Sequence, residues 1–245
     1  MYEGFAYIYD RLTRDIDYCR WADYIEEIFR INSQHPKLVL DMGCGTGTFC
    51  IEMAYRGYDM IGIDSSLDML NCARQKTEKA GFDILYINQD MTGFELYGTV
   101  DAIVCLLDSF NYITRKSDLK KMLKLVRNYL NPDGLFIFDV NSLYKIRDIL
   151  GNNVFFSVED DITYIWDNKY KNDNSICEFD LTFFVKDGSN LYRRYDEIHR
   201  ERAYSVEELT VLIGQSGMQL LNVYDDLSFL PPNDKSERIF FVCRK

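Results

Sequence analysis

The chain has 245 residues, of which 47% are hydrophobic and 27% are charged, with a formal net charge of -11. This composition is that of an ordinary globular protein, and the length suffices for one large α/β domain or for a domain with an insertion. The negative charge argues against nucleic-acid partners, which need a footprint of lysine and arginine. The longest apolar run, residues 102–107, is too short to span a bilayer, so we expect no membrane partner.

The cysteines and histidines restrict the chemistry further. The seven cysteines include no C-x-x-C pair, and the two histidines are far apart in the sequence. A disulfide framework or a zinc site would need closer grouping, so we expect no metal and a location in the reducing cytoplasm.

Apolar residues recur at helical spacing in residues 17–31, which predicts an amphipathic helix. Strand-like and helix-like segments then alternate strictly. The expected strands are residues 37–43, 58–66, 82–90, 100–108 and 132–141, and the expected helices between them are residues 48–57, 66–81 and 116–130. Apolar strands that alternate with helices indicate a parallel sheet covered by helices on both faces.

The pattern changes after the fifth strand. Turn-like compositions separate three strand-like runs, at residues 161–170, 175–185 and 190–204, which predicts an inserted antiparallel meander of three strands. The alternation resumes with a helix at residues 205–217 and strands at residues 218–226 and 238–244. We therefore expect an α/β fold with a doubly wound, mostly parallel seven-stranded sheet. Its domain would comprise residues 1–150, with a helical segment at 1–35, and residues 203–245, and the insertion would be residues 151–202.

Three glycines, Gly43, Gly45 and Gly47, follow the first strand and open the next helix. Such a cluster marks a required backbone shape or a close approach of another group. Ligands of doubly wound sheets bind outside the carboxyl ends of the strands, where this loop lies. The G-x-G-x-G spacing is one residue shorter than the dinucleotide fingerprint, which disfavours a nicotinamide or flavin cofactor.

The glycine loop stands in "LDMGCGTG" and is followed by "GIDSSLDML" and later by "NQDM". Together these motifs resemble those of class I S-adenosylmethionine-dependent methyltransferases, in the same order along the chain. The resemblance implies a Rossmann-like fold, S-adenosylmethionine as the cofactor and methyl transfer as the reaction.

The resemblance also implies roles for individual residues. The glycine loop would lie against the amino-acid end of the cofactor with Asp41 facing the ammonium group, Asp64 would accept hydrogen bonds from both ribose hydroxyls, and Asp90 would accept from the adenine amine. A tyrosine-rich entry helix, as in several small-molecule methyltransferases, would close the pocket with Tyr9. The residues expected at the cofactor are Tyr9, Trp21, Asp41, Gly43, Cys44, Gly45, Gly47, Asp64, Ser65, Met69, Asp90 and Met91.

Each of these positions also has a purely structural interpretation. The glycines could form a tight turn, Asp64 could cap a helix, and Asp90 could cap a turn. Met69 could be an ordinary core methionine, and the aromatic residues of the first helices could serve packing alone.

The acceptor should sit where the fourth strand ends. Methyl transfer from a sulfonium is an in-line displacement, so the enzyme gains mainly by aligning the nucleophile and excluding water. Asp108 and Tyr112 follow that strand, and His199 lies in the insertion, so these three are the candidates for orienting an acceptor. Asp108 could instead be a loop acid bonded to backbone amides, and His199 a surface residue.

The position of the insertion resembles that in enzymes that methylate small amines, where an antiparallel sheet forms a lid over the acceptor. We therefore expect a methyltransferase that acts on a nitrogen or oxygen of a small-molecule acceptor. Two alternatives stay open, a methyltransferase of RNA or protein and a non-catalytic protein that binds S-adenosylmethionine. The sequence specifies neither the acceptor nor an oligomeric state.

Overall fold

The structure is a computed structural model that describes residues 5–188 and 191–245. Its main sheet has seven strands in the order β10-β11-β5-β4-β1-β2-β3. The strands are β1 Leu38–Met42, β2 Asp59–Asp64, β3 Leu85–Asn88, β4 Val100–Cys105, β5 Leu130–Asn141, β10 Gln219–Asp225 and β11 Arg238–Arg244. Neighbouring strands are parallel except for β11, which runs antiparallel to both β5 and β10. The expected α/β fold class and sheet are confirmed.

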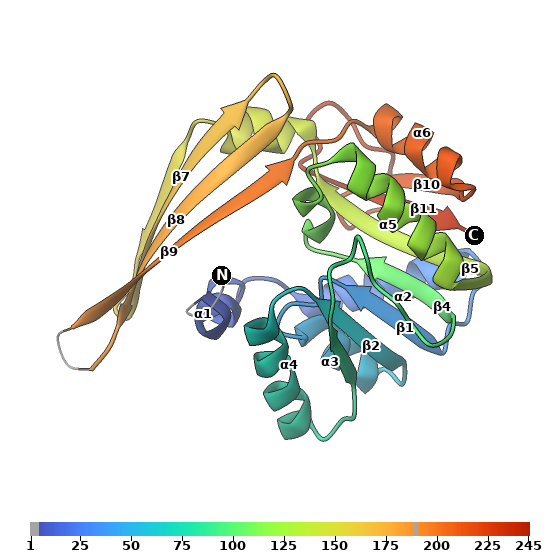
Figure 1. The fold of residues 1–245 in the computed structure, drawn as a ribbon, viewed down its shortest axis with the longest axis horizontal. Helices are drawn as coiled ribbons and strands as arrows, with labels where there is room; N and C mark the ends of the chain where they lie inside the picture. The colour runs from blue at the N-terminus through green and yellow to red at the C-terminus, as the bar shows by residue number, and fades with distance from the viewer. Residues whose placement is uncertain (1–4, 189–190) are drawn as a thin grey trace.

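Helices cover both faces of this sheet (Figure 1). One face carries α2 Tyr18–Ile31, α3 Thr48–Tyr55 and α4 Leu67–Ala80, and the other carries α5 Lys116–Tyr129 and α6 Val206–Ser216. Consecutive residues of a strand point to opposite faces, so Val39 packs in the core beneath α2 and α3 while Leu40 packs in the core beneath α5 and α6. No helix in the described part of the chain is long and apolar enough to cross a membrane.

A second, antiparallel sheet projects away from the main one in the order β6-β7-β8-β9 (Figure 1). Its strands are β6 Val154–Val158, β7 Ile162–Lys171, β8 Ile176–Lys186 and β9 Tyr192–Arg202, and a single helical turn, η2 Lys145–Leu150, precedes it. The expectation of three strands was wrong because β6 is also paired. This strand is short and lies at the edge of the sheet, where Phe156 and Val158 are exposed, so no buried face marks it in the sequence.

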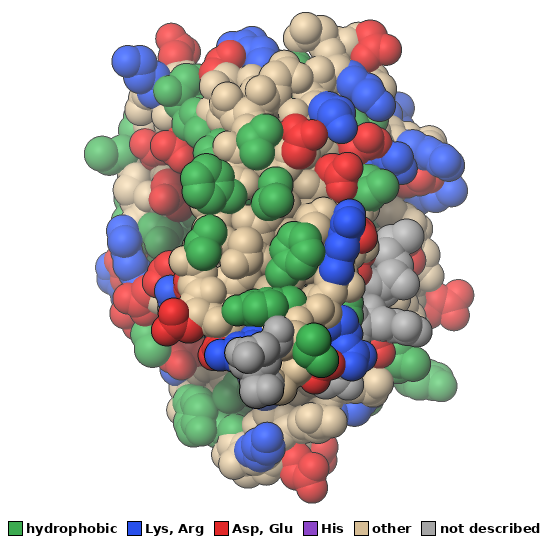
Figure 2. Space-filling view, turned by 90° about the vertical axis from the view of Figure 1, so that its left-hand side faces the viewer, with side chains coloured by type: hydrophobic (Ala, Val, Ile, Leu, Met, Phe, Trp, Pro, Cys, Tyr) green, Lys and Arg blue, Asp and Glu red, His purple; other side chains and the backbone are tan. Residues whose placement is uncertain are grey.

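Figure 2 views the molecule from the side on which the second sheet lies and shows hydrophobic side chains among charged ones. The inner face of that sheet packs on α1 Phe5–Leu12, where Ile8 meets Ile162 and Phe183. The helix α1 thus lies between the second sheet and the glycine loop.

Candidate active site

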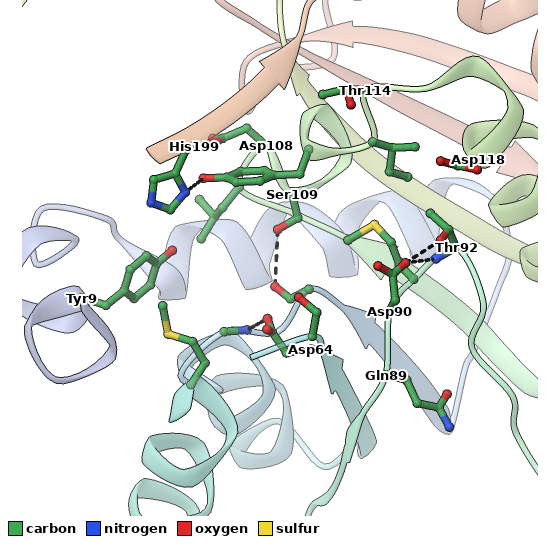
Figure 3. A pocket seen from close by; sticks show the side chains of 18 of the residues that line it. Tyr9, Asp64, Gln89, Asp90, Thr92, Asp108, Ser109, Thr114, Asp118 and His199 are labelled. Carbon is green, nitrogen blue, oxygen red and sulfur yellow. Dashed lines mark hydrogen bonds between the residues drawn. The ribbon is translucent and has the colours of Figure 1, made fainter. Parts of the chain in front are cut away.

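A cavity of about 470 Å³ lies at the carboxyl ends of β1, β2 and β4, bounded by α1 and β9 (Figure 3). It brings together most of the residues that the sequence analysis selected. Those in its wall are Tyr9, Gly43, Gly45, Asp64, Ser65, Met69, Asp90, Met91, Asp108, Tyr112 and His199. The wall also includes residues that the sequence analysis did not select, among them Thr13, Gln89, Thr92, Ser109, Arg115 and Arg238.

The three glycines of the loop after β1 have different surroundings. All three have positive φ, at 75° for Gly43, 53° for Gly45 and 73° for Gly47. A Cβ atom on Gly43 would lie 2.8 Å from Cβ of Ser109, and one on Gly47 would collide with the hydroxyl of Tyr86. A Cβ on Gly45 would meet only Tyr9, at 3.9 Å. Gly43 and Gly47 therefore permit close packing within the protein, whereas Gly45 leaves room at the cavity.

Asp64 ends β2 and ties it to the glycine loop. Its Oδ2 accepts a hydrogen bond from Gly45 N at 2.9 Å, and its Oδ1 accepts one from Ser66 N at 2.8 Å. Burial raises the pKa of Asp64, whereas the two backbone N–H groups lower it. The hydroxyl of Ser66 caps α4 by accepting from Met69 N, so that helix does not need Asp64 as its side-chain cap.

Four of the expected cofactor residues are not in the cavity wall. Asp41 is buried beneath the loop, where Cys50 Sγ donates to its Oδ2 at 3.3 Å, and burial raises the pKa of Asp41 to about 7. Trp21 packs against Phe240, with ring centroids 5.4 Å apart. The remaining two, Cys44 and Gly47, are packed against Gly62 and Tyr86, respectively.

An ionic cluster fixes α1 against the glycine loop. Asp10 accepts hydrogen bonds from Thr46 Oγ1 and Lys76 Nζ, both at 2.5 Å, and Lys76 also donates to Thr48 at 2.6 Å. Tyr9, the neighbour of Asp10, borders the cavity, and burial raises the pKa of its phenol. The sequence indicates Tyr9, but no local pattern marks Asp10 and Lys76, which are separated by 66 positions.

The acceptor candidates Tyr112 and His199 form a pair. The hydroxyl of Tyr112 lies 3.0 Å from His199 Nδ1, and their rings are nearly perpendicular at 87°. Tyr112 belongs to the short helix η1 Ser109–Tyr112 after β4, and His199 reaches it from β9. His199 is only 5% exposed, and burial lowers the pKa of its imidazole to about 4. The ring is therefore neutral at pH 7 and offers one donor and one acceptor nitrogen.

Asp108 stands beside this pair and is held by a residue from the far end of the chain. Its Oδ1 accepts a hydrogen bond from Arg238 Nη2 at 2.9 Å. Arg238 also pairs with Asp139 on β5, and Asp139 in turn accepts from the backbone N–H groups of Leu107 and Asp108. Neither Arg238 nor Asp139 is marked as a site residue by a local sequence pattern.

Comparisons with known proteins show the family. A family model described as "Methyltransferase domain" matches residues 39–134. The protein of Bacillus subtilis that is named methyltransferase YqeM is 37% identical over 248 aligned residues, which cover 100% of this chain and 97% of the relative. A crystal structure of an S-adenosylmethionine-dependent methyltransferase from Clostridium acetobutylicum is 36% identical, with a TM-score of 0.91 over 99% of this chain and 98% of that one.

The name of a more distant relative states the acceptor that this relative methylates. The dTDP-3-amino-3,4,6-trideoxy-alpha-D-glucopyranose N,N-dimethyltransferase of Streptomyces venezuelae is 29% identical over 57% of this chain and 58% of its own length. The two full-length matches and the cavity at the carboxyl ends of the strands lead to one conclusion. The chain belongs to the S-adenosylmethionine-dependent methyltransferases, and S-adenosylmethionine is its cofactor.

Proposed function

We propose that this methyltransferase transfers a methyl group to a nitrogen or oxygen atom of a small molecule bound beside Tyr112 and His199. One observation carries the proposal: a single cavity joins the glycine loop and Asp64 on one side to Asp108, Tyr112 and His199 on the other (Figure 3). A methyl donor and an acceptor bound there would share one space, as an in-line displacement requires.

The cavity wall suits S-adenosylmethionine. The cofactor carries ribose hydroxyls and an adenine amine that donate hydrogen bonds, and the carboxylates of Asp64 and Asp90 are acceptors at the ends of neighbouring strands. We propose that Asp64 binds the ribose and Asp90 the adenine, with Met69 and Met91 as apolar contacts. The open side of Gly45 would admit the methionine part of the cofactor.

The bound cofactor supplies an electrophilic methyl group on a positive sulfonium. The chain's own residues align the acceptor and exclude water, which is most of what such a displacement needs. A neutral His199 can accept a hydrogen bond from an acceptor amine or hydroxyl, because burial lowers its pKa to about 4 and keeps the ring uncharged. Tyr112 fixes the orientation of that ring through the contact with Nδ1.

Three observations favour a small-molecule acceptor over RNA or protein. The cavity volume, about 470 Å³, is in the range of ordinary small-molecule sites. The net charge of -11 disfavours a phosphate backbone. The Streptomyces venezuelae relative is named for an amino-sugar nucleotide that it dimethylates.

A turnover screen tests the proposal. Purified protein and S-adenosylmethionine are incubated with small amines and alcohols, including amino-sugar nucleotides, and the release of S-adenosylhomocysteine is measured. We expect turnover with a small molecule. In that reaction Asp108→Asn should lower kcat/KM about tenfold or more, as the loss of one charge-assisted hydrogen bond implies, while cofactor affinity stays within about threefold. Methylation of RNA or protein in a cell extract, without turnover of any small molecule, would overturn the proposal.

A further inference from the structure

The segment between β4 and η1 has an unusual backbone. Leu107 and Asp108 both have positive φ, at 55° and 56°, although neither is a glycine. Residues other than glycine rarely adopt this left-handed region, and a bulky residue such as leucine is uncommon there. The segment carries Asp108 into the cavity wall and leads directly into the helix of Tyr112. Something must therefore hold these two residues in this conformation.

Asp139 provides the restraint. Its side chain is completely buried on β5, and its Oδ1 accepts from Leu107 N at 2.7 Å while its Oδ2 accepts from Asp108 N at 3.0 Å. One carboxylate thus binds the N–H groups of both left-handed residues. An asparagine in its place would present an acceptor to one N–H and a donor to the other, so it could not bind both.

Arg238 completes the arrangement from the first residue of β11. Its Nη1 pairs with Asp139 and its Nη2 donates to Asp108 Oδ1, so it bridges two carboxylates that would otherwise repel each other. The guanidinium carbon of Arg238 lies over the Trp21 ring, 5.3 Å from the ring centroid. Arg238 reaches the cavity wall, but these two carboxylates engage both of its terminal nitrogens.

We propose that Asp139 and Arg238 are positioning residues for methyl transfer. They hold Leu107 and Asp108 in the left-handed conformation and thereby direct the Asp108 carboxylate and the Tyr112 hydroxyl toward the acceptor. The proposal rests on the proposed function, because it assumes that the acceptor binds at this end of the cavity. Since neither residue lies at the cofactor contacts of Asp64 and Asp90, their loss should impair acceptor use and spare cofactor binding.

The chain offers a matched control in Asp101, near the start of β4. Its Oδ2 accepts from Lys37 N at 2.8 Å and Leu38 N at 2.9 Å, and its Oδ1 accepts from Asn131 Nδ2 at 2.7 Å. It is therefore also a carboxylate that binds two consecutive backbone N–H groups. Asp101→Asn makes the same carboxylate-to-amide change at the opposite end of the strands from the cavity. Since both N–H groups bind one oxygen of Asp101, the amide oxygen can keep both bonds, and this variant controls for the loss of a carboxylate charge away from the acceptor end.

The experiment compares Asp139→Asn with Asp101→Asn in the full-length chain. Calorimetry measures S-adenosylhomocysteine binding, steady-state kinetics use the acceptor found by the screen, and crystal structures with S-adenosylhomocysteine report the backbone at positions 107 and 108. For Asp139→Asn we expect kcat/KM for the acceptor to fall about 30-fold or more and Kd for S-adenosylhomocysteine to change less than about threefold. Asp101→Asn should keep kcat/KM within about twofold. Arg238→Lys keeps the charge but not the bidentate geometry, and it replaces Asp139→Asn if that variant does not fold.

Several outcomes would overturn the positioning role. One is that kcat/KM for the acceptor is unchanged in Asp139→Asn. Another is that Asp101→Asn loses as much kcat/KM as Asp139→Asn does. A third is that Asp139→Asn loses as much affinity for S-adenosylhomocysteine as it loses in kcat/KM. If no small molecule is turned over, the proposed function fails, and the crystal structure then decides the positioning role separately. Negative φ at Leu107 or Asp108 in Asp139→Asn would support the restraint, and unchanged positive φ at both residues would contradict it.

Discussion

The buried imidazole of His199 makes the stability of the protein depend on pH in a specific way. The ring is 5% exposed and its pKa is lowered by burial from 6.5 to about 4. The folded state therefore binds the proton less tightly than the unfolded state. The stability that this ring contributes is complete above pH 6.5 and is lost as the pH falls toward 4. At about 1.4 kcal/mol per pKa unit, the free energy of unfolding should lose about 2 kcal/mol between pH 7 and pH 5, and about 3 kcal/mol in all.

Other buried groups titrate in the same interval with the opposite sign. Burial raises the pKa of Asp41 to about 7 and that of Glu201 to about 8, so these carboxyls stabilise the fold at low pH and lose that effect as the pH rises. The pH dependence of the free energy of unfolding, measured on the wild type alone, would therefore combine the contributions of His199 and of these buried carboxyls. The variant His199→Gln contains the same acids, so the difference between the two proteins isolates the imidazole.

Two assays test the argument. The chain has only two histidines, so NMR resolves few ring signals, and a His35→Gln variant identifies that of His199. The NMR chemical shift of the His199 ring should stay constant from pH 8 to about pH 5 and should titrate near pH 4. Urea unfolding at pH 7 and pH 5 should show that the wild type loses about 2 kcal/mol more than His199→Gln. A His199 signal that titrates at pH 6.5 or above would refute the reasoning, and with it the neutral imidazole beside the acceptor.

Two further predictions concern the cofactor side. If Asp64 binds the ribose as proposed, Asp64→Ala should weaken S-adenosylmethionine binding about 30- to 150-fold, or roughly 2 to 3 kcal/mol, because two charge-assisted hydrogen bonds would be lost and water would recover part of them. Calorimetric titration checks this against Asp59→Ala at the exposed start of β2, and equal affinities for wild type and Asp64→Ala would contradict the ribose role. Gly47→Ala should lower the free energy of unfolding by about 1 to 3 kcal/mol more than Gly57→Ala. Both glycines have positive φ, but only a Cβ on Gly47 would strike Tyr86, so equal losses on urea unfolding would exclude that steric explanation.

The sequence was sufficient for the main sheet and for one half of the cavity. Asp64 and Asp90 each follow an apolar run, and the carboxyl ends of parallel strands meet at one edge, so their proximity follows from strand order in the chain. Trp21 is different. Helical spacing places it on the buried face of α2, but its contact with Arg238 depends on β11 lying beneath that helix, which no local pattern specifies.

The sequence did not indicate the restraint that Asp139 and Arg238 place on Asp108, for a related reason. Asp139 lies within the apolar run of β5 and was interpreted as part of an ordinary buried strand, although a lone carboxylate near the carboxyl end of such a strand needs partners. Arg238 begins its strand, and the first residue of a parallel strand would lie far from the cavity. Since β11 is antiparallel, Arg238 pairs with Asn141 at the carboxyl end of β5. Only the direction of the last strand brings this cation to the site.

The glycine loop and the acceptor segment are in direct contact, which bears on how the two halves of the cavity are coupled. A Cβ on Gly43 would lie 2.8 Å from Cβ of Ser109, the residue that follows Asp108. Ser109 Oγ also donates to Leu106 O at 2.8 Å, so this serine is fixed at the end of β4. The glycine loop therefore packs against Ser109, which is held by Leu106 O rather than by Asp139. Because packed interiors yield little, a side chain at position 43 should displace Ser109, and with it Asp108, together with the glycine loop.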